Sequence, residues 1–514
     1  MAKATAKTRQ TDVVIVGGGL AGLTAGIGLQ REGLDVVVLE KDKRLGGRAQ
    51  SWTDETTGDP VHIGPHIFLT EYPNMFKLLD LLGTRGDIVW EDEHFIVLAD
   101  GSERLVQEQY PLPAPFHFAP TMMADPRART RDKLSNLAVT LYAMQMDERD
   151  VMRLDGMNAY AFLRRMGVTK AYIDQFWSFA CMAIMNVPIE VCSAGALMRF
   201  FQKFIGYDTF SFGFPDGGLG DLFAPAAKQE IERAGGEVRL RTEVSRLRVE
   251  GERVVGVELA DGTTIEAKHT VAAVPPQVLR NLGPRQWMGE YEWYRELVHF
   301  HPCPYVSVFL WFDEKITDLR MWARTHSPDD LNCDFYDLSN IHTGWRERPS
   351  VICSNIIYCH RTDGMTDEEI VRHTVAEIAE THPAASMDHL EHYVVNRIPM
   401  AIHCPYPGTE KRRPVTDPGV EGLVLAGDFV RTELPSSMES AVCSGWMAAE
   451  KILEQRGHKK QLHVEHRDLD GLTGLISRTA KLFPTKGAQR IIHGMRRTLD
   501  ETPLLTRPAD PVNK

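Results

Sequence analysis

The sequence predicts an α/β fold in which a parallel sheet, flanked by helices and a β-hairpin layer, is interleaved with a second, α+β domain. The first observation behind this is a β-branched run at 13–16 that breaks into glycines at 17–19 and is followed by an apolar helical segment. The second is a pair of similar short apolar runs far along the chain, at 271–274 and 423–426. The third is the length of 514 residues, which exceeds what one hydrophobic core usually organises. We therefore expect two domains.

The glycine turn matches the pattern of a dinucleotide-binding unit. Gly17 permits a tight turn, Gly19 lets the backbone approach a pyrophosphate, and Gly22 lets the helix at 20–32 pack close to the preceding strand. The positive end of that helix then faces the phosphates. The next strand ends at Glu40, where a carboxylate can accept a hydrogen bond from a ribose hydroxyl. The unit is therefore predicted to be Rossmann-like and to bind a dinucleotide.

Three further segments separate FAD from NAD. They read Gly-Gly-Arg at 46–48, Leu-Ala-Gly-Asp at 425–428 and Ser-Met-Glu at 437–439. This combination resembles the FAD-binding superfamily of amine oxidases and carotenoid desaturases, in which the first and second of these segments contribute to the same cofactor. The resemblance implies FAD. No cysteine lies in the motif that tethers flavin in monoamine oxidases, and Cys443 falls within the terminal helix pattern, so we expect the FAD to be non-covalent.

A narrower resemblance follows at residues 64–90. Gly-Pro-His-Ile-Phe at 64–68, followed by Tyr-Pro-Asn at 72–74, is similar to plant- and cyanobacterial-type phytoene desaturases. Hydroxysqualene dehydroxylases share much of the pattern. Pro65 departs from it, because an apolar residue with a backbone N–H is expected there.

The resemblance implies a set of cofactor contacts drawn from all these motifs. They are Gly17, Gly18, Gly19, Leu20, Ala21, Gly22, Glu40, Lys41, Gly46, Gly47, Arg48, Gly64, Pro65, His66, Ile67, Val244, Gly427, Asp428, Ser437, Met438 and Ala441.

The implied reaction is hydride transfer between flavin N5 and an apolar isoprenoid or polyene chain, with quinone or oxygen as electron acceptor. Such chemistry depends mainly on alignment, so few acids or bases are needed. His66 and Arg413 are the only catalytic candidates, and His66 is alternatively a hydrogen-bonded structural residue. A carotenoid desaturase is the first hypothesis. The alternatives are a hydroxysqualene dehydroxylase, a flavin amine oxidase, whose Trp-Ser-Gly-Tyr is replaced here by residues 434–437, and a non-catalytic FAD-binding protein.

The domains are expected to alternate along the chain, because the dinucleotide pattern stops and resumes twice. Helical segments rich in Met and aromatic residues at 176–204 would line an apolar cavity or form ordinary helix core. The expected FAD-binding segments are 11–90, 207–276 and 415–457, preceded by a short leader; the substrate domain comprises 91–206 and 277–414; and 458–514 form a C-terminal tail.

Composition excludes several classes of protein. A net charge of −12 argues against nucleic-acid binding, and no run reaches the 18 apolar residues of a membrane span. The eight cysteines lack a framework spacing and the N-terminus lacks the apolar core of a signal peptide, so a cytoplasmic protein is expected. His299, His301 and Cys303 alternate but have no fourth ligand, so we expect no metal.

The tail differs in charge from the rest of the chain. Residues 471–499 contain six basic and no acidic residues, and apolar residues recur at helical spacing within 472–483 and again within 491–495. Two short amphipathic helices are predicted. They would lie on an anionic membrane or dock against the enzyme's own acidic surface. An isoprenoid substrate favours the first, that is, peripheral attachment to the inner face of the cytoplasmic membrane.

Overall fold

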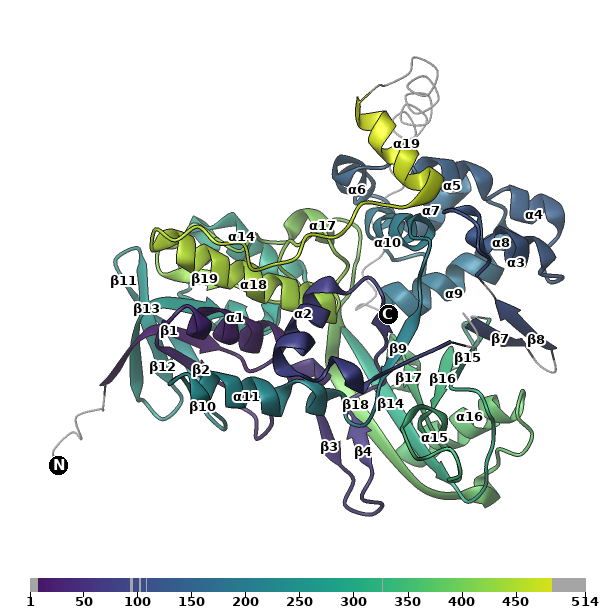
Figure 1. Ribbon diagram of the computed structural model, residues 1–514, viewed down its shortest axis with the longest axis horizontal. Coiled ribbons are helices and arrows are strands. Elements are labelled where there is room, and N and C mark those ends of the chain that lie inside the picture. Colours follow the sequence, from purple (N-terminus) through teal and green to yellow (C-terminus); the bar gives the residue numbers. More distant parts are fainter. Residues whose placement is uncertain (1–7, 93–95, 101–102, 108, 326, 483–514) are drawn as a thin grey trace.

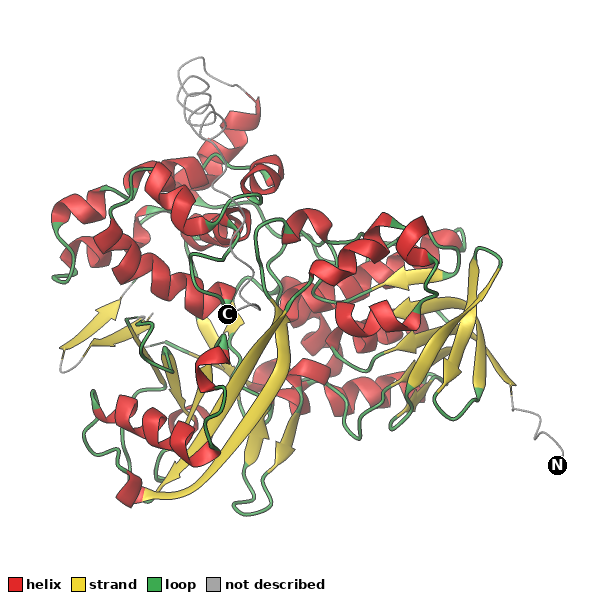
Figure 2. Cartoon of the chain, turned by 180° about the vertical axis from the view of Figure 1, so that it is seen from behind, coloured by secondary structure: helices red, strands yellow, loops and turns green. Residues whose placement is uncertain are grey.

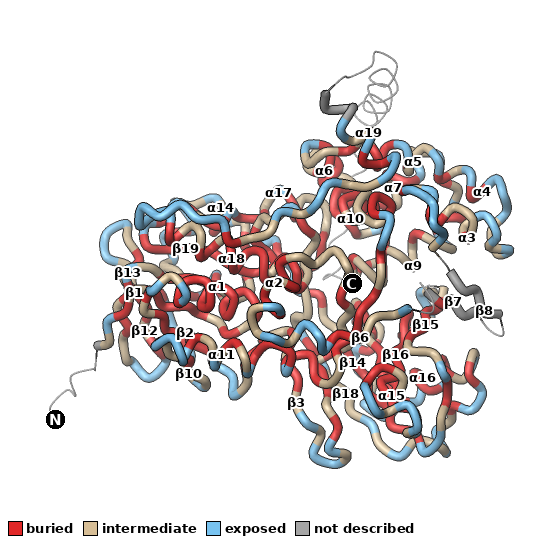
Figure 3. The backbone as a smooth tube through the Cα atoms, in the orientation of Figure 1, coloured by how far each residue is buried: buried red, intermediate tan, exposed pale blue. Residues whose placement is uncertain are grey.

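The computed structural model describes residues 8–92, 96–100, 103–107, 109–325 and 327–482. The molecule has two parts. At the left of Figure 1 a sheet is covered by helices, and at the right a layer of helices adjoins a second sheet. Buried residues run through both halves and across the junction between them (Figure 3). The predicted fold class is confirmed.

The dinucleotide sheet has the strand order β10-β2-β1-β13-β12-β11, with β19 added beside β13. Strands β10, β2, β1, β13 and β19 pair in parallel, and β11, β12 and β13 pair antiparallel as the expected hairpin layer. The bounds are β1 (Thr8–Val16), β2 (Val36–Leu39), β10 (Glu237–Arg239), β11 (Val244–Glu250), β12 (Arg253–Leu259), β13 (Thr264–Ala272) and β19 (Leu423–Leu425).

The beginning of β1 corrects the expected leader. Thr8, Arg9 and Gln10 already pair with β13, so the leader was predicted too long by these three residues. The residues before Thr8 lie outside the described chain.

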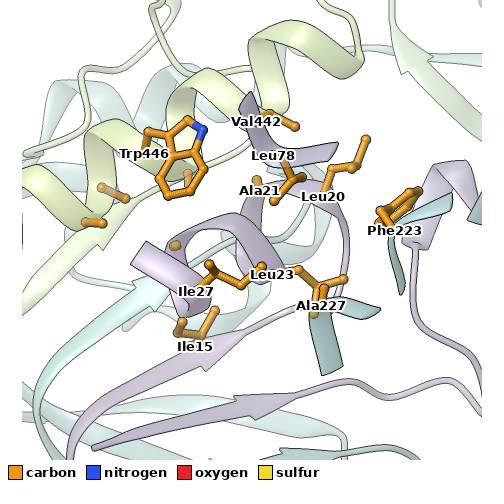
Figure 4. Packing of buried hydrophobic residues seen from close by; sticks show 14 of the residues in the cluster. Ile15, Leu20, Ala21, Leu23, Ile27, Leu78, Phe223, Ala227, Val442 and Trp446 are labelled. Carbon is orange, nitrogen blue, oxygen red and sulfur yellow. The ribbon is translucent and has the colours of Figure 1, made fainter. Parts of the chain in front are cut away.

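Helices α1 (Leu20–Arg31), α2 (Pro73–Leu82), α11 (Ala224–Arg233) and α18 (Met438–Gln455) cover one face of this sheet. Figure 4 shows Ile27 of α1 between Ile15 below and Trp446 of α18 above. Helices α1 and α18 approach closely because a glycine of α18 lies against the backbone of α1. A Cβ on Gly445 would lie 2.5 Å from the carbonyl oxygen of Ala21.

The opposite face corrects one domain boundary. Helices α12 (Pro276–Leu282), α13 (Trp287–Glu290) and α14 (Glu292–Glu296) pack on Val14 and Val37 of the dinucleotide sheet. Residues 277–300 were expected in the substrate domain. Their apolar residues instead cover this face of the sheet, which would otherwise be exposed.

The second sheet has the order β18-β14-β17-β16-β15-β7-β8. Its two longest strands, β14 and β18, run side by side and are prominent in Figure 2. The bounds are β7 (Ile96–Asp100), β8 (Glu103–Gln107), β14 (Pro302–Phe312), β15 (Met321–Arg324), β16 (Asp334–Asp337), β17 (Val351–Ile356) and β18 (Leu390–His403).

Alternation along β14 fixes the two faces of this sheet. Val306, Val308 and Leu310 pack against α16 (Asp367–Ala379), whereas Phe309 and Trp311 belong to a cluster on the other face. Because successive side chains point to opposite faces, odd-numbered residues of β14 look toward the dinucleotide domain.

The remaining elements complete the helical layer and the junction. Two π-helical turns at 173–177 and 181–185 flank α9. The bounds are α3 (Ala119–Ala124), α4 (Thr130–Leu134), α5 (Leu137–Ala143), α6 (Glu148–Leu154), α7 (Ala159–Arg165), α8 (Lys170–Tyr172), α9 (Ser178–Ala180), α10 (Ala194–Gly206), α15 (Leu338–Ile341), α17 (Thr409–Arg412), β3 (Ser51–Thr53), β4 (Pro60–His62), β5 (Phe68–Leu69), β6 (Ile88–Trp90) and β9 (Phe212–Pro215).

The described part of the tail docks on the enzyme itself. We call residues 458–470 the strap; Asn74 bonds to both backbone groups of its residue Val464, at 2.7 and 2.9 Å. The strap leads into α19 (Gly471–Leu482), which confirms the first predicted amphipathic helix. Leu472 N–H donates to the carbonyl of Ala114 at 2.8 Å, and Ile476 packs on the helical layer. The second predicted helix, within 491–495, lies outside the described residues.

Candidate active site

One cavity of about 1140 Å³ runs from the glycine turn into the space between the helical layer and the second sheet. Its wall contains every predicted cofactor contact except Gly18 and Gly22. Segments that are as far apart in the sequence as 17–22, 244 and 427–441 therefore meet around one space.

The glycine turn leaves no room for side chains. Gly17 has a φ of +109°, and its N–H donates to the Leu39 carbonyl at 2.8 Å. A Cβ on Gly22 would lie 1.9 Å from the carbonyl oxygen of Gly17, so only glycine allows α1 to start this close to β1. Gly18 and Gly22 thus shape the turn from behind the wall.

The first turn of α1 provides a place for an anion. Its N-cap is Gly19, no side chain of the described residues caps it, and its first turn holds no acidic residue. The uncapped amides face the cavity, because Gly19, Leu20 and Ala21 line it. A pyrophosphate fits here, since the free N–H groups and the helix dipole both favour negative charge.

Glu40 closes the turn on the side of β2. Its Oε2 accepts from Gly18 N–H at 2.8 Å and its Oε1 from Asp42 N–H at 2.9 Å. Burial raises the pKa of Glu40, and these two N–H groups act in the opposite direction. Each carboxylate oxygen keeps a second lone pair, which leaves acceptor capacity for ribose hydroxyls.

Arg48 and Asp428 form an ion pair across the cavity wall. Arg48 donates from both terminal nitrogens, Nη1 to Oδ2 at 3.2 Å and Nη2 to Oδ1 at 2.5 Å. The Ser436 hydroxyl also donates to Asp428, and His403 Nδ1 lies 3.9 Å from Oδ2. Burial alone would raise the pKa of Asp428, but Arg48 and Ser436 hold that pKa well below its usual range. Sequence reasoning missed Ser436 and His403, which carry no motif.

His66 lies in a loop held by the second sheet. Its Nδ1 donates to the Gly64 carbonyl at 2.8 Å, which leaves Nε2 as the unprotonated nitrogen. Burial lowers the pKa of His66, so the ring is neutral. Asn355 Nδ2 donates to the Pro65 carbonyl at 3.0 Å, and Ser307 Oγ donates to the Ile63 carbonyl at 2.7 Å. These bonds fit the structural alternative for His66, and its catalytic role stays a prediction.

Arg413 lies behind the wall. Its Nη1 donates to the Leu434 carbonyl at 2.6 Å and its Nη2 to the Asp428 carbonyl at 2.8 Å. Only 2% of the residue is exposed, and it does not line the cavity. The geometry supports a positioning role for Arg413 in holding residues 428–434, and does not support a role at the reacting atoms.

The far part of the cavity is mainly apolar. The Met and aromatic residues predicted from sequence divide between wall and core: Met185 and Met198 are core, whereas Phe200, Phe201 and Phe204 of α10 face the space. The apolar wall includes Met122, Phe176, Phe179, Phe200, Phe201, Phe204, Phe210, Phe212 and Met321.

Several polar wall residues were not predicted. Lys203, Asp334, Tyr336, Asn355 and His466 line the cavity, although each lies in an otherwise apolar helix, in a strand or in the strap. Strand pairing or docking of the strap brings these residues to the cavity wall, and neither arrangement can be read from a single sequence. Among the described residues no cluster of three or more potential ligands that could hold a metal ion is found.

Comparisons with known proteins agree with this geometry. The family model of flavin containing amine oxidoreductase matches residues 20–453. The 15-cis-phytoene desaturase of Capsicum annuum is 28% identical over 87% of this chain and 78% of that protein. The Synechococcus elongatus protein of the same name is 25% identical over 86% of this chain and 96% of its own length. A solved putrescine oxidase bound to putrescine superposes with a TM-score of 0.66 at 18% identity, covering 87% of this chain and 100% of its own, and shows the fold alone.

Replacing Glu40 by alanine is expected to leave the purified protein largely colourless. Loss of a charge-assisted hydrogen bond costs about 1.5–3 kcal/mol, or roughly ten- to over a hundred-fold in affinity for FAD. The measurement is flavin absorbance per protein. Glu55→Ala removes an exposed carboxylate elsewhere in the same domain and serves as control. Full flavin occupancy in Glu40→Ala would remove Glu40 from the site.

Proposed function

Because the chain belongs to the family of flavin containing amine oxidoreductases, we propose that it is a carotenoid-type desaturase acting on an apolar isoprenoid chain. FAD is its cofactor and the protein is an oxidoreductase. We call the predicted cofactor contacts that line the cavity, apart from residues 64–67, the cofactor cradle. FAD bound there would supply a two-electron hydride acceptor at its ring. The relatives named phytoene desaturase support the choice of substrate class.

The observation that carries this proposal is the continuity of the cavity. The same space that begins at the glycine turn extends into an aromatic, mainly apolar wall formed by Phe200, Phe201 and Phe204 of α10 and by Phe212 of β9. A long hydrocarbon is bound mainly by burial of its surface, which requires such a wall.

A hydroxysqualene dehydroxylase is the second candidate, because the apolar wall also carries the polar groups Lys203, Asp334 and Tyr336. These groups could bind an oxygen function on an otherwise apolar chain. An amine oxidase is less well supported: residues 434–437, Leu-Pro-Ser-Ser, form the wall where that class carries Trp-Ser-Gly-Tyr.

The desaturase proposal predicts that anaerobic mixing with 15-cis-phytoene in detergent bleaches the oxidised flavin absorbance, with a desaturated product in the extract. Hydroxysqualene mixed with the photoreduced enzyme is the matched experiment, in which reoxidation of the flavin and formation of squalene would establish the second candidate instead. Bleaching by putrescine, with no bleaching by phytoene and no reoxidation by hydroxysqualene, would contradict both.

We infer that FAD is bound without a covalent link. Cys443 does not line the cavity, and burial raises the pKa of its thiol to about 12, so it is not a nucleophile near neutral pH. Acid precipitation should therefore release the yellow colour into the supernatant. Colour retained in the washed pellet would show the opposite.

We also propose that a quinone or oxygen reoxidises the flavin and that the protein meets its substrate at a cytoplasmic membrane surface. Among the described residues no helix is long and apolar enough to cross a membrane. Exposed apolar side chains lie on the helical layer at Met123, Leu134, Leu137 and Leu141, and on α19 at Leu475. The sequence after 482 is rich in basic residues, and basic residues together with exposed apolar ones favour binding to anionic lipid.

Liposome flotation tests this attachment. Full-length protein should float with vesicles of phosphatidylglycerol and phosphatidylcholine at low salt and be released by salt, whereas a chain ending at Leu482 should bind more weakly. Phosphatidylcholine vesicles are the control. The cut follows Leu482 because a chain ending at Gly457 would lose the strap, which carries His466 into the cavity wall. Equal binding of both chains, or binding of neither, would contradict the proposed membrane attachment.

A further inference from the structure

Desaturation removes two hydrogens from neighbouring carbons, one as hydride and one as a proton. If the proposed function holds, the flavin ring accepts the hydride and a group in the wall must accept the proton. The titratable wall residues outside the cofactor cradle are therefore the candidates. They include His66, Glu71, Asp125, Lys203, Asp334, Glu439 and His466.

Most of the wall carboxylates are committed to other partners. Glu71 pairs with Arg467 at 2.8 Å and Asp125 with Arg127 at 2.9 Å. Glu439 accepts from Asn74 and Met75 and lies 3.3 Å from His466. The oxygens of these carboxylates are therefore already engaged by donors or ion-pair partners.

Of the three basic wall candidates, His466 faces Glu439 at 3.3 Å, and Lys203 and His66 are poor acceptors for opposite reasons. Burial lowers the pKa of Lys203 only to about 8, so the amine is mostly protonated at neutral pH. Burial also lowers the pKa of His66, whose protonation would place a cation near Arg48. Neither group is well suited to take a proton in the oxidised enzyme.

Asp334 differs from all of these. It begins β16, lines the cavity and is 8% exposed. Its Oδ2 accepts from the Tyr336 hydroxyl at 2.8 Å, and the Cys333 thiol lies 4.0 Å from Oδ1. Among the described residues no basic side chain forms an ion pair with it.

Strand register places Asp334 beside the loop that carries His66. Ser307 pairs with Asn396 on one side and with Asn355 on the other. Phe335, the residue after Asp334, pairs with Ser354, the residue before Asn355, so Asp334 lies next to Asn355 at the end of this pairing. These four residues, Asn396, Ser307, Asn355 and Asp334, form a polar row across the sheet. The first three donate to carbonyls of residues 62, 63 and 65. Asp334 makes no such bond and faces the space.

We propose that Asp334 is the catalytic base that accepts the proton during desaturation. A C–H bond breaks on one of the two carbons that become the double bond. Its electron pair forms the C=C bond, and its proton passes to a carboxylate oxygen of Asp334. Bound FAD would supply the two-electron acceptor for the hydride that leaves the neighbouring carbon.

The surroundings of Asp334 suit this role. Burial raises its pKa to about 6, and the Tyr336 hydroxyl bond acts against that rise. The other titratable groups facing Asp334 are Tyr305 of β14, Cys353 of β17 and the preceding residue, Cys333. None of these groups carries a positive charge. The carboxylate is therefore present at neutral pH and is more basic than an exposed aspartate.

The test is anaerobic stopped-flow reduction of the bound FAD by 15-cis-phytoene between pH 5 and 8. In the wild type the rate should rise through about pH 6 to a plateau. Asp334→Asn should lower the plateau by about 10²- to 10⁴-fold and abolish the pH dependence, with FAD content retained. Asp329→Asn makes the same change at an exposed position in the loop before β16 and is the control.

Tyr336→Phe gives a second readout. Loss of its hydroxyl bond should raise the pKa of Asp334 and move the rise in rate to higher pH while the plateau persists. A rise that stays in place in Tyr336→Phe, or an unchanged rate in Asp334→Asn, would overturn the assignment while leaving the desaturase function intact. A wild type that phytoene does not bleach at any pH would overturn the proposed function and this assignment with it.

Discussion

The ion pair between Arg48 and Asp428 is the interaction on which the architecture of the site depends. It joins the Gly-Gly-Arg loop to the end of β19, and the two residues are 380 positions apart in the chain. Taking charges out of water is costly, and here Arg48 offsets the cost for Asp428 with two parallel bonds, helped by Ser436. If either partner is lost, the other charge stays uncompensated at the wall where the early and late motifs meet.

Around this pair, the two domains shape their sides of the cavity in different ways. The dinucleotide domain exposes backbone N–H groups by using glycine where a side chain would collide, as at Gly22. The second sheet instead uses strand alternation. One face of β14 packs against α16, and the other face directs Ser307 toward the loop that carries His66. The cavity lies where the exposed backbone of one domain meets the patterned face of the other.

The sequence predicted the parts of the site that are local. Gly17 to Glu40 is one continuous strand, turn, helix and strand, so its geometry follows from residue types at fixed spacing. The polar row could not be found this way, because Asn396, Ser307, Asn355 and Asp334 become neighbours only through long-range pairing. The boundary at 277 failed for the same reason: the helices that follow it read as a new domain, and only packing on Val14 and Val37 assigns them to the first sheet. Arg413 resembled a site residue from its motif, but its burial makes it a support for the loop at 428–434.

The strap has a consequence for the order in which the protein is assembled. His466 follows every other cavity-lining residue in the chain, and the side-chain amide of Asn74 in α2 donates both to Glu439 of α18 and to Val464 of the strap. During synthesis the cradle and the apolar wall therefore exist before the cavity is closed on this side. The wall of the cavity on this side is therefore completed by the last of the lining residues to leave the ribosome.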